Sequence, residues 1–124
     1  MRSLQFVAVA ALLAAGPVHA ACTYPKAPDR IPDGSTATRE EMLAAQKAVK
    51  AYNEEMNTYL ECLKSEYEDM LAREGANLTE ERKQDLERMQ VQRHNAAIDE
   101  LQSVADRFNE QVRVFKARND NKKK

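Results

Sequence analysis

The sequence predicts an all-α protein, in which two long helices fold back on each other as an antiparallel hairpin with coiled-coil character, behind an extended N-terminal arm. Two observations carry this prediction. From Thr38 to the C-terminus the chain holds one helix breaker, Gly75, and no proline. Along the same stretch, apolar side chains recur every seven residues, the repeat of a coiled coil. Such a chain has few loops, the segments in which catalytic and binding residues usually lie.

Residues 1–20 have the layout of a secretory signal peptide, which is removed from the mature protein. Basic Arg2 precedes an apolar segment, Leu4–Ala15, that is too short to span a bilayer comfortably. Small residues predict cleavage after Ala20. An N-terminal membrane anchor is the alternative. We expect an exported protein, and the alanine-rich segment favours the periplasm of a bacterium.

A lipoprotein signal is a further alternative, because Cys22 follows two alanines. That signal needs a branched apolar residue three positions before the cysteine, where this chain has His19. We therefore expect no lipid anchor.

Charge argues against several classes of partner. Without the signal peptide, 104 residues remain, with 18 basic and 20 acidic side chains. This balance argues against nucleic acid, an anionic membrane or an acidic substrate as the partner. The one basic cluster, Lys122–Lys124, lies in a basic tail, residues 119–124, which we interpret as solubilising and frayed. Contact of this tail with an anionic surface is the alternative.

Residues 21–37 are predicted to form an extended, proline-rich arm. Regular helix is interrupted there by Pro25, Pro28, Pro32 and Gly34. The sizeable apolar side chains of the arm, Tyr24 and Ile31, are expected to pack onto the helices. Thr38 and Glu41 fit a capping box that begins the first helix.

Two cysteines, Cys22 and Cys62, stand in a chain that we expect to reach an oxidising compartment. An even pair in a small exported domain predicts one disulfide, and free or intermolecular thiols are the alternative. Cys62 lies about 36 Å along a helix that begins at Thr38. The extended arm spans up to about 50 Å, so the pair is within reach. Closing this loop would contribute on the order of 4 kcal/mol of stability.

The first helix is predicted from Thr38 to Glu74. One line of its apolar face consists of Met42, Val49, Met56, Leu63 and Met70. A second line consists of Ala45, Tyr52 and Tyr59, and the stripe is widened by Leu43, Leu60, Tyr67 and Leu71. The methionines of the first line that are fourteen residues apart lie about 21 Å from one another, too far to share a copper ion. We interpret them as core side chains.

Gly75 is predicted to cap the first helix in the left-handed conformation, within a turn at residues 75–79. Thr79 then caps a second helix that runs from Glu80 to Arg118. The apolar face of this helix consists of Leu86, Met89, His94, Ala97, Ile98, Leu101, Val104, Ala105, Phe108, Val112 and Phe115. This face is wider than a two-row coiled-coil seam, which fits a helix with more than one neighbour.

Catalysis and metal binding are poorly supported, and we expect neither an enzyme nor a cofactor. Catalytic triads need side chains that converge from separate loops, and the helices leave no room for such loops. The one histidine outside the signal peptide, His94, lies on the apolar stripe and is predicted to be a core or interface residue. No histidine or cysteine spacing typical of a metal site occurs.

Two sets of residues resemble known families. The residues that carry the first resemblance are Cys22, Ile31-Pro32-Asp33-Gly34, Thr36-Ala37-Thr38, Glu41-Met42, Tyr52 and Tyr59-Leu60-Glu61-Cys62-Leu63. They resemble a family of uncharacterised exported proteobacterial proteins, which implies export and pairing of the cysteines but no activity. Leu78-Thr79-Glu80-Glu81-Arg82 loosely resembles the Leu-Thr-x-x-Gln motif of the periplasmic stress chaperones related to Spy, without the glutamine.

The sequence therefore predicts a periplasmic structural or protein-interaction module that associates with itself, and it implies no small-molecule substrate. The predicted interaction stripe consists of Met42, Val49, Tyr52, Met56, Tyr59, Leu63, Met70, Leu101, Val104, Phe108, Val112 and Phe115. The alternative function is a holdase-like chaperone that binds unfolded clients through the same adaptable side chains.

Overall fold

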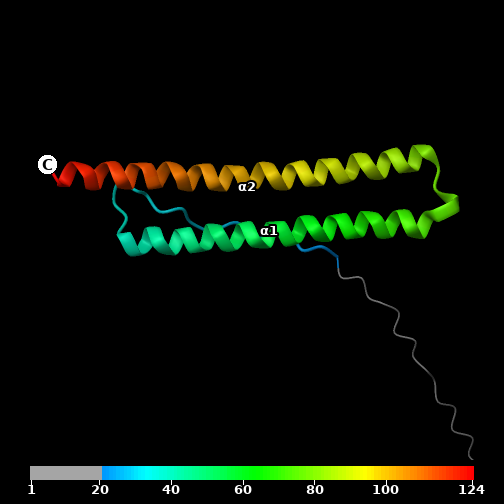
Figure 1. Cartoon of the computed structure of the whole chain (residues 1–124), viewed down its shortest axis with the longest axis horizontal. Coiled ribbons are helices and arrows are strands. Elements are labelled where there is room, and N and C mark those ends of the chain that lie inside the picture. The colour runs from blue at the N-terminus through cyan, green and yellow to red at the C-terminus, as the bar shows by residue number, and fades with distance from the viewer. Residues whose placement is uncertain (1–20) are drawn as a thin grey trace, which may run out of the picture.

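The computed structural model describes residues 21–124, and the predicted signal peptide lies outside the described residues. Over that range the protein is all-α, as predicted. Two long helices, α1 (Arg39–Glu74) and α2 (Glu80–Lys122), are joined by a short 3-10 turn, η1 (Gly75–Asn77). Figure 1 shows the two helices side by side along most of their length, so that they form a helical hairpin.

Both helices begin at a threonine cap. The Thr38 hydroxyl accepts a hydrogen bond from the Glu41 backbone N–H at 3.1 Å, and the Glu41 carboxylate accepts one from the Thr38 N–H at 2.8 Å. This reciprocal pair is the predicted capping box. Thr79 accepts from the Arg82 N–H at 3.1 Å, so the second predicted cap is also confirmed.

Gly75 ends α1 in a backbone conformation that other residues avoid. Its φ is +44° and its ψ is −121°, and nothing lies within 4 Å of a Cβ built on it. The backbone angles, rather than a lack of space, therefore make glycine suitable here. The predicted glycine cap is confirmed, but the left-handed helical conformation is wrong in ψ. The chain leaves Gly75 directly into the 3-10 turn.

The arm, residues 21–37, forms a third layer beside the two helices. Figure 1 shows it running from the middle of α1 back toward the start of that helix, with a loop that reaches α2. At this loop the Gly34 N–H donates to Gln111 Oε1 at 2.9 Å. Arg118 Nη2 donates to the Ala37 carbonyl at 2.6 Å. The arm contains neither helix nor strand, as its prolines predict.

Two hydrophobic clusters make up the core. The central cluster consists of Tyr52, Met56, Tyr59, Leu63, Ala97 and Val104. The terminal cluster consists of Ala37, Met42, Ala45 and Phe108. Cys22 and Ala27 of the arm pack against the central cluster, and Ile31 packs against the terminal one. The core is therefore built from both helices and the arm together, and the predicted packing of Ile31 is confirmed.

The last helix is longer than predicted. α2 continues past Arg118 to Lys122, so the expectation of a frayed tail from residue 119 is wrong for its first four residues. No glycine or proline follows Gly75 to stop the helix. The bond from Arg118 to the arm also ties the last turns of α2 to the rest of the fold.

We predict that Gly34→Ala destabilises the protein. A Cβ on Gly34 would overlap the Gln111 carbonyl oxygen and lie 2.9 Å from the Phe115 nitrogen. Both atoms belong to the backbone of α2, which cannot give way without losing helix hydrogen bonds. The free energy of unfolding should fall by about 1–3 kcal/mol, measured by denaturant unfolding followed by circular dichroism. Thr36→Ala, at an exposed position of the same turn, is the control, and equal midpoints for the two variants would contradict the close approach.

Candidate functional site

The arm is held to α1 by a disulfide between Cys22 and Cys62, whose Cα atoms lie 5.7 Å apart. This confirms the predicted pairing. The bond joins the start of the arm to the middle of α1, while the capping box at Thr38 fixes its other end. The arm is thus anchored at both ends, and it shields one side of the central cluster.

A tyrosine pair marks the place where the arm covers the central cluster. The rings of Tyr24 and Tyr59 meet edge to face, with centroids 5.0 Å apart. This confirms that Tyr24 packs onto the helices, although 48 % of its surface stays exposed. Beside the pair, Arg93 of α2 contacts Glu66 of α1 at 3.1 Å. Partial burial works to lower the pKa of Arg93, but hydrogen bonds to Glu66 and Tyr59 outweigh it and raise that pKa.

Tyr52 carries a buried hydroxyl beneath the arm. The side chain is 2 % exposed, and among residues 21–124 no atom forms a hydrogen bond with its hydroxyl. Burial raises the pKa of Tyr52, and the nearby Tyr24 and Glu100 raise it further, against an opposing effect of Arg107. An unpaired buried hydroxyl costs free energy. The hydroxyl therefore offsets part of the stability that the buried ring of Tyr52 contributes to the central cluster.

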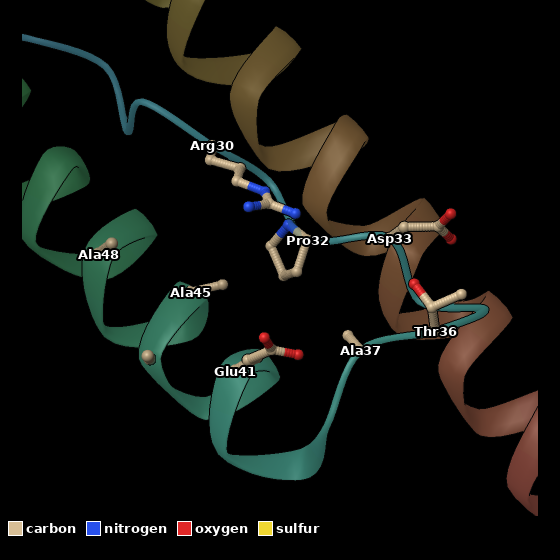
Figure 2. Close-up of a pocket in the computed structure, with 9 residues that line it drawn as sticks. Arg30, Pro32, Asp33, Thr36, Ala37, Glu41, Ala45 and Ala48 are labelled. Atoms are coloured by element: carbon tan, nitrogen blue, oxygen red, sulfur yellow. The ribbon is translucent and has the colours of Figure 1, made fainter.

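A groove of ≈ 440 Å³ lies between the arm and the first turns of α1. Figure 2 shows Pro32 directed toward Ala45 on its floor, with Arg30 and Glu41 above and below. Both nearby carboxylates already serve the local fold. Glu41 accepts the Thr38 N–H, and Asp33 accepts the Ser35 N–H at 2.9 Å and the Ser35 hydroxyl at 2.6 Å. The groove is the space left where the arm packs on α1, and both of its carboxylates are already engaged in hydrogen bonds of the local fold.

The predicted interaction stripe forms the inside of the hairpin. Its buried members are Met42, Tyr52, Met56, Tyr59, Leu63, Val104 and Phe108. Its half-buried members are Val49, Met70, Leu101, Val112 and Phe115. Within one chain the arm and the facing helix together cover most of this stripe, and a role of its remaining surface in binding another protein stays a prediction.

His94 lies on the surface, so of its two predicted roles the core position is wrong, and the interface position stays a prediction. The residues that α2 contributes to the central cluster are Ala97 and Val104, and His94 lies at the edge of the helix face that these two residues share. In the part of the chain that the structure describes, no three histidine, cysteine, aspartate or glutamate side chains are placed to hold a metal ion. Neither α1 nor α2 has a stretch that is apolar enough to cross a membrane.

One side of α2 faces the arm. Arg107 lines a groove with Ile31 and Asp33 of the arm. Glu100, seven residues earlier, contributes to the raised pKa of Tyr24, and Arg93, a further seven earlier, contacts Glu66. At 3.6 residues per turn, residues seven apart share a face of a helix. The row Arg93–Glu100–Arg107 therefore marks the arm side of α2.

The other side of the hairpin has no covering segment in residues 21–124. We call it the open flank, and it consists of Val91, Ile98, Ala105 and Val112 of α2 with Leu60 and Tyr67 of α1. Leu60 and Val112 form its inner border, because they also pack against the central and terminal clusters. Ile98 lies about 140° around α2 from Arg93, at about 100° per residue. Leu60 is similarly far around α1 from Cys62. Val91 is 50 % exposed, and the other members of the flank are half-buried.

The chain matches no family model, no curated protein and no solved structure. The two resemblances drawn from sequence motifs therefore stay predictions. The site consists of a covered flank, which is the arm side of α2 marked by Arg93, Glu100 and Arg107, of the open flank, and of the core between them.

Sequence reasoning missed three residues that position the arm. Gly34 is buried against α2, whereas the sequence shows it only as a helix breaker. Gln111 and Arg118 hold the arm by hydrogen bonds, yet on α2 they look like surface residues. The wide apolar face of the second helix was the one available signal, since it indicated a further neighbour.

We predict that Tyr52→Phe leaves stability unchanged or raises it by up to about 1 kcal/mol, because it removes a hydroxyl that is buried without a partner. The folded state raises the pKa of Tyr52, so ionisation at alkaline pH favours the unfolded chain. Wild-type stability should fall as pH rises from about 10 through the folded pKa. The phenylalanine variant should lose less stability over this range.

The measurement is denaturant unfolding at neutral and alkaline pH, with Tyr67→Phe, which alters a half-buried tyrosine outside the central cluster, as the control. A loss of 1 kcal/mol or more in Tyr52→Phe at neutral pH would show that the hydroxyl is hydrogen-bonded after all.

Proposed function

We propose that this chain is an exported structural module that binds protein, and above all itself, through the surface of an antiparallel helical hairpin with coiled-coil character. The observation that carries the proposal is the open flank. Val91, Ile98, Ala105 and Val112 repeat every seven residues along the side of α2 that faces away from the arm. A seven-residue apolar repeat on a helix surface is suited to a further helix packed alongside.

The covered flank supports the same proposal. The arm fills the space that a third helix would occupy on that side, and the disulfide holds it there. A partner helix therefore has one side of the hairpin left to pack against. The binding surface is long and rigid, and it consists of side chains on two helices rather than loops.

Export accounts for the disulfide and for the N-terminal segment together. A secretory signal in residues 1–20, cleaved after Ala20, would deliver the chain to a compartment in which Cys22 and Cys62 become oxidised. The periplasm of a bacterium is the location that we favour. The mature protein would carry no lipid anchor and would need no cofactor for its function.

A holdase-like chaperone is the second candidate, and a specific observation favours it. Leu43, Met89 and Val91 are 48–50 % exposed, on different sides of the helices. Flexible apolar side chains such as methionine suit surfaces that accept varied clients. In this case the open flank would stay free until an unfolded chain bound there.

Light scattering and dye binding on the purified, oxidised protein distinguish the two candidates. A self-associating module should give one defined oligomer and bind little ANS, because the apolar flank is covered by the partner. A holdase should bind the dye and suppress the aggregation of a reduced test protein. A monomer that binds no dye and protects no client would contradict both.

A further inference from the structure

We propose that the partner on the open flank is a second copy of this chain, with the two α2 helices packed side by side in opposite directions about a two-fold axis at Ile98. The inference rests on the proposed self-association and specifies its geometry. It is drawn from the spacing of apolar and charged residues along α2.

From Val91 to Val112 the apolar row of the open flank holds no acidic residue, and Glu87 lies on the same side just before Val91. The apolar row Val91–Ile98–Ala105–Val112 is bordered, about 60° around the helix, by a second row. That row reads Glu81, Arg88, Asn95, Gln102, Asn109, Lys116 and Lys123. The amides occupy its middle and the charges its ends, so a partner packed on this side desolvates few charges at the centre.

The charges at the two ends of α2 have opposite sign. Glu80 and Glu81 lie in its first turn, and Lys116 lies toward its C-terminal end, next to a chain end that carries Lys122–Lys124. Arg88, the remaining charge of the border row, is already paired with Asp85 of the same helix. The free charge of this side is therefore acidic at one end and basic at the other.

A two-fold axis through Ile98 brings complementary groups together. Residues at equal distances on either side of Ile98 then face each other across the axis. Val91 meets Ala105 of the second copy, and Glu80 meets Lys116 of the second copy, about 27 Å from the centre at about 1.5 Å per residue. The Val91–Ala105 pair and the Glu80–Lys116 pair each form twice, as an isologous interface requires.

The parallel arrangement is disfavoured by the same charges. Packed in the same direction and register, the two copies would place Glu80 against Glu80 and Lys116 against Lys116. Like charges across an interface oppose association, whereas opposite charges select partner and direction. The charge pattern therefore favours a second copy running in the opposite direction.

Sedimentation velocity over a range of concentrations tests the interface. Ile98→Asp places two carboxylates face to face at the centre of the apolar row, and it should weaken dimerisation at least about a hundredfold. Ala96→Asp is the matched control, because Ala96 is exposed and lies about 160° around α2 from Ile98. That variant should dimerise like the wild type, and circular dichroism should show the same helicity for both.

A charge exchange tests the direction. Lys116→Glu should weaken the dimer about tenfold, because it places a second carboxylate opposite Glu80 at both ends of the interface. Adding Glu80→Lys in the same chain should restore most of the affinity, because opposite charges then face each other again. Direct proximity is tested by Ile98→Cys. Because both native cysteines are in the disulfide, the new thiol should form a covalent dimer on oxidation, and Ala96→Cys should not.

The outcomes separate this inference from the proposed function. An oligomer that Ile98→Asp leaves intact would overturn the α2 interface while leaving self-association in place. A dimer that shows no rescue by the charge exchange would overturn the opposite-direction packing. A wild-type monomer at about 100 µM would overturn both. If the wild type is a monomer that binds the dye, and Ile98→Asp abolishes this binding, the second copy is ruled out and the open flank is instead a binding surface for an unfolded client.

Discussion

The docking of the arm onto the helical hairpin is the constraint on which the rest of this structure depends. A pair of helices alone buries one stripe on each partner and leaves the flanks of both stripes exposed. Here the disulfide and the capping box hold the arm across one flank, where Gly34 fits against the backbone of α2. Both hydrophobic clusters are completed by arm residues. A chain of this size buries little apolar surface. The surface that the arm covers is therefore a large part of what stabilises the hairpin.

The arm also makes the molecule two-sided, and this asymmetry bears on function. The flank that it covers is closed to partners, while the flank opposite keeps an apolar row with a seven-residue repeat. The interaction stripe predicted from the sequence is mostly the hairpin's own interior. The apolar side chains that one chain leaves partly exposed lie beside that stripe, on the open flank, where Val91, Ile98 and Ala105 are found. Binding through this flank would leave the intramolecular core undisturbed.

Local features of the sequence were sufficient to predict the elements. Gly75, the Thr38–Glu41 pair, Thr79 and the spacing of the cysteines each act through neighbouring residues or through chain length, and the structure confirms these features apart from the ψ of Gly75. The rotation of the helices about their axes depends on contacts between distant residues. Gly34 meets Gln111, and Arg118 meets Ala37, across most of the chain. No pattern in either segment indicates these pairs, so the sequence could not show which flank the arm covers, nor that His94 would be exposed.

Hydrogen–deuterium exchange of the oxidised protein, compared with a Cys22→Ser/Cys62→Ser double variant, tests the role of the arm most directly. Amides of α1 and α2 beside the arm, in residues 42–63 and 97–115, should exchange more slowly than those near the turn at Gly75. Losing the disulfide should speed exchange mainly in the arm and in those two ranges, because release of the arm uncovers their shared core. Equal protection along both helices, unchanged in the double variant, would show that the hairpin stands without its arm and would contradict this account.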